Sequence, residues 1–260
     1  MLRVMRLNWT PVTDRVLVTS VEPHRVNVGL IIGDDEALLI DSGNTPEQGA
    51  ELLASAEDRA GVPVRRVVLT HDHHDHVGGV AGMGEVEVIA HENLTGASVT
   101  RPFSMAMAVD LGGQRVELIH FGQAHTRSDA VVFVPGENVV FAGDLLEEGA
   151  DPQVDESSSL SNWPTVLDGA LGATNDATRF VPGHGAVVDR DFAFVARAEI
   201  AMLYSSSEML IQQGVRVEDA ATATDWPFTP ETLASALPKA YAELAAKGIE
   251  PKRQLPISSL

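Results

Sequence analysis

The run HDHHDH at residues 71–76 constrains this chain more than any other stretch, because it follows directly after the apolar segment VRRVVLT at 64–70. A short valine-rich run of this kind is typical of a buried strand. The four histidines and two aspartates in these six positions have three interpretations: a solvated polar loop, a single metal site, or half of a larger site. The sequence therefore predicts a buried strand that delivers a polar loop whose role depends on the rest of the chain.

Strands and helices are expected on both sides of this loop. The segment 45–61 has a threonine cap, an early proline and a closing glycine, which together predict a helix. Strand-rich halves that each finish in helices indicate an α/β (α+β) fold with a sheet-on-sheet core and helices outside. The other expected elements are strands at 14–22, 64–70, 86–92, 115–122 and 178–185, hairpins at 25–43 and 130–144, and helices from Trp163, at 191–214 and at 229–248.

The residue inventory restricts the chemistry. The chain has no cysteine, which excludes disulfides, thiol nucleophiles and cysteine-bound zinc or iron–sulfur sites. Any metal must be held by nitrogen and oxygen, and nine histidines suit zinc, iron or manganese.

Charge and hydropathy exclude two classes of partner. A formal net charge of −19 argues against a nucleic-acid surface, which needs clustered lysine and arginine. No apolar run approaches the roughly 18 residues of a membrane span, and the first 15 residues lack the apolar core of a signal peptide. We therefore expect a cytoplasmic protein without a membrane partner.

The spacing within the histidine loop favours two metal ions over one. His71 and His73 are two residues apart and converge on one ion if the backbone is extended there. Asp75 and His76 come after the chain turns toward a Gly-Gly pair and point elsewhere. One ion cannot use all of these groups, whereas two ions about 3.5–4 Å apart can.

Such ions still lack ligands, which other strand ends must supply. His125 precedes a strand, Asp144 ends the strand NVVFAGD, and His184 ends TRFVPGHG. Each is a metal-binding type of side chain beside an apolar strand, and neighbouring glycines let the backbone come close.

Taken together, these motifs resemble the metallo-β-lactamase fold hydrolases. The resemblance rests on HDHHDH, AHTRSD, FAGD and VPGHG in that order, with LLIDSG upstream, and covers about residues 14–190. It implies an αββα four-layer sandwich with metals at the sheet edge. Residues 1–190 would form the catalytic domain, and 191–260 a C-terminal helical extension packed on it.

The resemblance also implies a role for each site residue. Asp144 would bridge two metals, and Asp41 would fix the histidine loop through hydrogen bonds, although a simple turn cap after a strand is the alternative for Asp41. The first metal would be held by His71, His73 and His125, and the second by Asp75, His76 and His184.

The function implied is that of a dinuclear zinc hydrolase, with iron or manganese as other metals. A hydroxide formed at the metals would attack the acyl carbonyl of a small molecule, an ester, thioester, lactone or β-lactam. Asp75, which can orient that hydroxide, and Asp144 would be the catalytic residues. The alternatives are a mononuclear iron persulfide dioxygenase and a non-catalytic binding protein of the same fold.

Departures from the family pattern argue against some of the family's substrates. Asp144 stands where some β-lactamases have cysteine and others serine. The following segment, LLEEGADP, differs from that of glutathione-thioester hydrolases, and Glu147 stands where acyl-homoserine lactonases have tyrosine.

The remaining candidates are expected to be structural. His74 is predicted to face solvent or to support the ligands, His91 and His120 to pack or hydrogen-bond, and Trp163 to lie in the core. The serine-rich loop DESSSLS is expected to border the cleft. The C-terminal helices are expected to shape the entrance or to form a dimer interface, and the sequence leaves the oligomeric state open.

Overall fold

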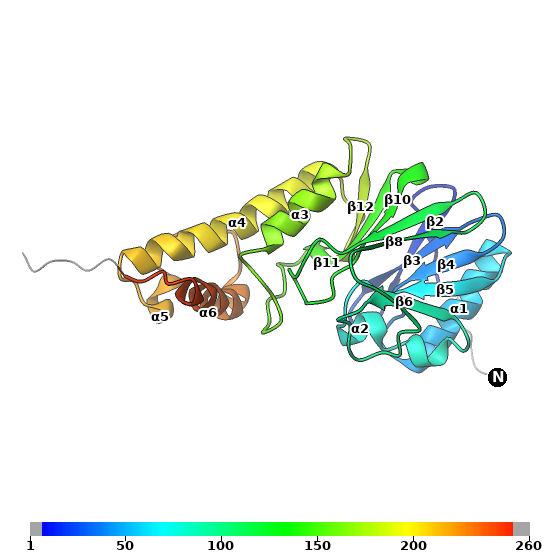
Figure 1. Ribbon diagram of the computed structural model, residues 1–260, viewed down its shortest axis with the longest axis horizontal. Helices are drawn as coiled ribbons and strands as arrows, with labels where there is room; N and C mark the ends of the chain where they lie inside the picture. Colours follow the sequence, from blue (N-terminus) through cyan, green and yellow to red (C-terminus); the bar gives the residue numbers. More distant parts are fainter. Residues whose placement is uncertain (1–6, 252–260) are drawn as a thin grey trace, which may run out of the picture.

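Twelve strands form one hydrogen-bonded network within residues 7–251, the part of the chain that the computed structural model describes (Figure 1). Strands β3 and β12 join two halves of this network through a single antiparallel pair, Val26 with His184. The first half contains β1 (Thr10–Pro11), β2 (Val16–Val21), β3 (Val26–Ile32), β4 (Ala37–Ile40), β5 (Val64–Val68), β6 (Glu87–His91) and β7 (Arg101–Phe103). The second half contains β8 (Ala106–Asp110), β9 (Arg115–Ile119), β10 (Val131–Val134), β11 (Val139–Glu147) and β12 (Arg179–His184).

The two halves pack face to face. Ile31 and Ile89 of the first half share one buried cluster with Val132 and Phe141 of the second. Burial of this apolar surface is the main force that holds the halves together. The expected sheet-on-sheet core is confirmed.

Helices cover both outer faces. Helix α1 (Pro46–Ala60) buries Leu52 and Ala56 against β3–β5. Its cap is the predicted one, since the Thr45 side chain accepts a hydrogen bond from the Gln48 N–H and Gly61 is left-handed at φ 71°. The other helical segments are α2 (His74–Val77), η1 (Val80–Gly82), η2 (Pro135–Glu137), α3 (Trp163–Gly172), α4 (Arg190–Gln212), α5 (Val217–Ala220) and α6 (Pro230–Ala246).

Helices α3 and α4 form the fourth layer, and α6 packs against α4. Val166, Leu203 and Leu237 of these helices share a buried cluster with Val131 and Val140 of the second half-sheet. The order is therefore helix, sheet, sheet, helix, which confirms the predicted αββα fold class.

The C-terminal helices also reach beyond the sandwich. Helix α4 starts at the sandwich, and α5 and α6 lie at its far end (Figure 1). The predicted domain ranges, 1–190 and 191–260, include residues 1–6 and 252–260, which lie outside the described part. That division stays a prediction. None of the helices in residues 7–251 combines the length and the apolar character needed to cross a membrane.

One predicted strand end was wrong. The sequence predicted that Asp144 ends its strand, whereas β11 continues to Glu147 because buried Leu145 and Leu146 extend the apolar run. The pairing of β11 with β12 shifts register on both sides of Gly143, whose φ is 53°. Asp144 therefore lies at an irregularity inside the strand, and such irregularities redirect side chains.

Candidate metal centre

Seven histidine and aspartate side chains meet at one end of the sandwich. They come from the loop after β5, the start of α2, the loop before β10, the irregular part of β11 and the end of β12. These are the residues that the sequence singled out: His71, His73, Asp75, His76, His125, Asp144 and His184.

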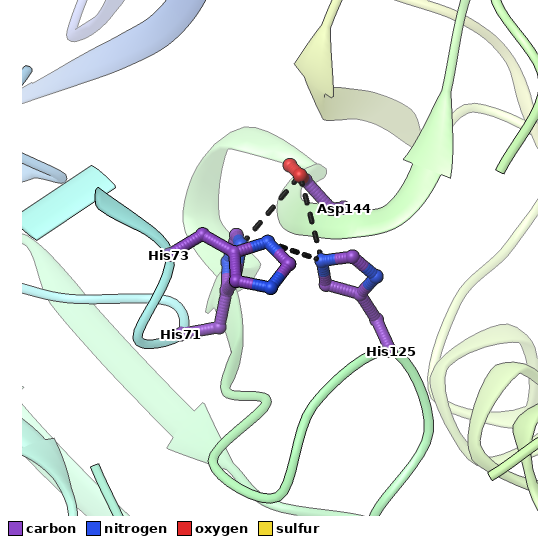
Figure 2. A group of neighbouring side chains, drawn as sticks. All are labelled: His71, His73, His125 and Asp144. Atoms are coloured by element: carbon purple, nitrogen blue, oxygen red, sulfur yellow. Dashed lines mark hydrogen bonds and ion pairs between the residues drawn. The ribbon is translucent and has the colours of Figure 1, made fainter. Parts of the chain in front are cut away.

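The first group contains three histidines and Asp144. Its potential ligand atoms all lie within 4.8 Å of one another. The side chains of His71, His73, His125 and Asp144 point toward one another, as Figure 2 shows. The His73 Nδ1 lies only 3.0 Å from the His125 Nε2. The two nitrogens are close enough to bind the same ion.

The second group contains Asp75, His76 and His184, and it also falls within 4.8 Å. The Asp75 Oδ2 lies 3.3 Å from the His184 Nε2 and 3.7 Å from the His76 Nε2. Asp75 and His76 lie on the short helix α2, whereas His71 and His73 precede it.

Asp144 lies between the groups. Its Oδ2 is 3.5 Å from the His71 Nε2 and 3.6 Å from the Nε2 atoms of His125 and His184. Its Oδ1 is 3.1 Å from the His76 Nε2. One carboxylate thus faces both groups, which is the position that a bridging ligand requires.

Outer hydrogen bonds fix four of the five imidazole rings. In each case the Nδ1 atom contacts a protein oxygen, so that Nε2 points inward, as is usual for metal-binding histidines. The contacts are His71 Nδ1 with Thr70 Oγ1 at 3.0 Å, His76 Nδ1 with Asp41 Oδ2 at 2.8 Å, His125 Nδ1 with the Gln153 carbonyl at 3.1 Å and His184 Nδ1 with the His24 carbonyl at 2.9 Å.

Asp41 connects two of these rings. It accepts hydrogen bonds from the Thr70 N–H at 2.8 Å and from the Thr70 hydroxyl, whose Oγ1 also contacts His71. It also holds His76, and it is only 2% exposed. Asp41 adopts a left-handed φ of 64°, which aims its carboxylate back at the loop. These contacts are those expected of a residue that fixes the histidine loop, and they exceed what a turn cap needs.

The inward atoms fit a cation. The Nε2 atoms of His71, His76 and His184 and the Asp144 Oδ1 are buried and make no well-aligned hydrogen bond. Buried polar atoms are rarely left this way without a partner. A divalent ion satisfies such converging lone pairs, and a set of five imidazoles and two carboxylates suits zinc, iron or manganese.

The protonation states favour the same conclusion. Burial, reinforced by neighbouring imidazoles, lowers the pKa of His71 to about 4 and that of His125 to about 3. Both rings are therefore neutral near pH 7, which is the form that binds metal.

His184 behaves differently in the metal-free protein. Burial opposes its protonation, but the hydrogen bonds to Asp144 and Asp75 outweigh burial and raise its pKa to about 10. Burial likewise opposes ionisation of Asp75, yet His184 and His76 hold its pKa well below the usual range. A positive charge is thus favoured beside these carboxylates, and a bound cation can replace the proton.

Two glycines allow the close approach of β11 to its neighbours. A Cβ atom on Gly183 of β12 would overlap the Asp144 Oδ1. A Cβ on Gly143 would lie 2.9 Å from the Thr70 Oγ1, and its left-handed φ also disfavours a side chain. The sequence analysis expected such close approaches from the glycines beside the candidate ligands.

A cavity of about 550 Å³ opens onto this centre. Its wall includes His73, Asp75 and His184, so the centre is accessible to a small molecule. Gln153, Val154 and Asp155 also line it, so the serine-rich loop, DESSSLS, borders the cavity through its first residue, Asp155. Glu147 lies on the same wall, and burial together with the neighbouring Asp144 raises its pKa to about 8.

The remaining predicted residues lie where the sequence placed them. His74 is exposed, and Trp163 is fully buried in the core with its Nε1 donating to the Leu145 carbonyl. His91 and His120 stack with ring centroids 3.8 Å apart, and both hydrogen-bond to backbone carbonyls.

Sequence reasoning missed several contacts around the centre. Asp155 Oδ2 lies 3.1 Å from the His73 Nε2, and the backbone oxygens of Gln153 and His24 orient two other rings. A polar residue in a serine-rich loop gives a weak signal, and a backbone carbonyl gives none.

Comparisons with known proteins agree with this picture. The sequence model of the Metallo-beta-lactamase superfamily matches residues 21–92 and 108–192. The Metallo-beta-lactamase type 2 of Bacillus cereus is 26% identical over 174 residues, which cover 62% of this chain and 68% of that protein. The Metallo-beta-lactamase domain-containing protein 1 of Xenopus laevis is 32% identical over 157 residues, 57% of this chain and 66% of that protein.

Solved structures show the same fold. The metallo-beta-lactamase from Pontibacter korlensis superposes with a TM-score of 0.67 at 24% identity, covering 75% of this chain and 99% of that one. The metallo-beta-lactamase FIM-1 from Pseudomonas aeruginosa, solved in a mono-zinc form, gives a TM-score of 0.65 at 22% identity, covering 76% and 95% of the two chains.

Proposed function

Since the chain belongs to the metallo-beta-lactamase superfamily, we propose that it is a metal-dependent hydrolase that holds two zinc ions and cleaves an acyl bond of a small molecule. The observation that carries this proposal is the position of Asp144, whose two oxygens face two separate groups of ligand atoms. His71, His73 and His125 would hold one ion, and Asp75, His76 and His184 the other. When bound, such ions lower the pKa of water and polarise a carbonyl group.

The chain's own residues would organise the reaction. The outer hydrogen bonds from Asp41, Thr70, Gln153 and His24 hold the ligands in place before the substrate arrives. Such preorganisation lowers the cost of assembling the reactive geometry.

Asp75 would handle the proton. It lies on the cavity wall with an 18% exposed side chain, so its carboxylate reaches both the ligands and the substrate space. From there Asp75 Oδ2 can orient the attacking water and take its proton. The buried Asp144, at 2% exposure, has no such access and would serve in binding.

Metal analysis combined with a substrate panel tests this proposal. We expect about two equivalents of zinc per chain, loss of hydrolysis on chelation, and recovery when zinc is added back. The panel contains chromogenic β-lactams, lactones, aryl esters and thioesters. One equivalent of iron with oxygen uptake on a persulfide would instead establish an oxidoreductase. Zinc-loaded protein without activity on the whole panel would favour a binding protein.

The role of Asp41 can be measured separately. We expect the Asp41→Asn variant to bind zinc about 10- to 100-fold more weakly than the wild type, because it loses the charged acceptor that orients His76 and Thr70. Competition with a zinc-sensitive dye measures this. The exposed Asp110→Asn variant is the control, since Asp110 only accepts from the Gly112 N–H in a turn. Equal zinc affinity in Asp41→Asn and the wild type would assign Asp41 a purely structural role.

A further inference from the structure

A second cavity adjoins the first. It measures about 430 Å³, and the two cavities share Glu147 and Ala150 on their walls. Most of its other wall is apolar, including Leu145, Phe192, Val195, Ala196, Ile200 and Phe228. A small-molecule site that is largely apolar and beside a polar reaction centre fits the usual form of a binding pocket.

The C-terminal helices build this second cavity. Its wall combines the end of β11 and the loop after it with the first half of α4 and residues 227–229, just before α6. The Thr229 N–H donates to Asp151 at 2.6 Å and fixes the start of α6 against that loop. In Figure 1, α4 runs from the sandwich toward α6, and α2 lies on the other side of the sandwich. The cavity therefore depends on the segment that follows the sandwich.

Glu147 marks the junction between the cavities. It is only 8% exposed, and its Oε1 is buried without a hydrogen-bond partner. An unpartnered buried carboxyl oxygen between two cavities points to a polar group of a ligand that completes its hydrogen bonding.

The charged residues of the second wall disfavour an anionic group in the second cavity. Asp75 and Asp155 line the first cavity, and Asp151 and Glu199 line the second. Neither wall includes a lysine or an arginine. A carboxylate or phosphate in the second cavity would therefore lie near Asp151 and Glu199, with no cationic side chain on that wall to pair with.

We propose that the second cavity binds the hydrocarbon group of a neutral substrate whose acyl carbonyl lies at the histidines. The substrate class is then esters, thioesters or lactones of medium-chain carboxylic acids. In the reaction, the oxygen of one water forms a bond to the acyl carbon. The bond from that carbon to the leaving oxygen or sulfur breaks, and the leaving atom takes a proton. This substrate class rests on the proposed hydrolase function.

Binding of uncleaved amides tests the second cavity without any turnover. Each added methylene buried in an apolar site strengthens binding about fourfold. We therefore expect octanamide to bind at least about 30-fold more tightly than butanamide, as measured by titration calorimetry with the zinc-loaded protein. The monoanion of octanedioic acid monoamide is expected to bind at least about tenfold more weakly than octanamide. Equal affinities for the two amides would overturn the proposal.

A variant that fills the second cavity tests the same assignment. The Ala196→Trp variant places an indole in the second cavity, and it is expected to weaken octanamide binding at least about tenfold while leaving butanamide unchanged. The control is Ala198→Trp, because Ala198 is exposed on the same helix and lines neither cavity. If Ala196→Trp binds octanamide as the wild type does, the assignment of this cavity is wrong.

Hydrolysis of 4-nitrophenyl butyrate and octanoate separates this inference from the function on which it rests. A zinc-dependent preference for octanoate, lost in Ala196→Trp, supports both. Zinc-dependent hydrolysis with no chain-length preference overturns the inference and leaves the hydrolase function standing. Length-dependent amide binding without any ester hydrolysis overturns the hydrolase function and with it the substrate class, while a hydrocarbon-binding cavity remains.

Discussion

The Asp144→Asn variant is expected to lose at least one of the two proposed metal equivalents and to hydrolyse acyl substrates at least about 1,000-fold more slowly than the wild type. The Asp144 oxygens lie within 3.6 Å of four imidazole Nε2 atoms from both ligand groups. An amide has nearly the same shape, but it carries no charge and only one acceptor oxygen. It cannot bridge two cations.

Metal content and activity should be measured on the same sample, together with thermal unfolding to show that the variant folds. The Asp168→Asn variant is the control, because Asp168 lies on α3 and pairs with Arg197 at the surface. Full metal content with near-wild-type turnover in Asp144→Asn would refute a bridging role for Asp144.

Much of the fold could be predicted because its strands are long apolar runs and its first helix has complete end signals. Segment 45–61 begins with Thr45 and ends with Gly61, and the structure uses both residues as caps. The valine-rich strands β10 and β11 are buried along their whole length, and β5 buries its three valines. In these segments the local signal and the tertiary environment agree, so the sequence alone is sufficient.

The strands that could not be predicted lie near the sheet edges. Strand β8 buries only Val109 of its five residues, and β7 has three residues with Pro102 at its centre. Segments with so few buried side chains lack a clear alternation of apolar and polar residues. In the structure, β8 pairs with β9 and β7 pairs with β6, and the sequence of the edge strands alone does not indicate these partners.

The candidate site was predictable for a related reason. The seven candidate ligands are metal-binding side chain types next to apolar strands, a combination that can be recognised in the sequence alone. What lies around them is not. The carbonyls of Gln153 and His24 reach the rings of His125 and His184 only through the tertiary fold, and a backbone oxygen has no sequence identity.

The position of Glu147 between the two cavities could not be predicted from the sequence either. In the sequence it is only the residue that replaces a tyrosine of related lactonases. In the structure it separates a polar cavity from an apolar one, and α4 supplies much of the apolar wall from about 50 residues further along the chain. The expectation that the C-terminal helices shape the entrance agrees with this arrangement, whereas their role in a dimer stays untested.

The Asp75→Ala variant is expected to disrupt the second ligand group while leaving the first intact. It removes the only carboxylate that is unique to the second group, while His71, His73, His125 and Asp144 remain. We expect it to retain about one metal equivalent and to lose at least about 1,000-fold in hydrolysis, because both a ligand and the acceptor that orients water are gone.

The control for this variant is Asp72→Ala, three residues earlier in the same loop. The Asp72 carboxylate accepts a hydrogen bond from Thr95 at 2.9 Å and lies outside both ligand groups. Elemental analysis and steady-state kinetics on both variants decide the question. If Asp75→Ala turns over like the wild type, Asp75 has no part in the reaction. If Asp72→Ala loses as much activity as Asp75→Ala, the effect arises from the shape of the loop rather than from the Asp75 carboxylate.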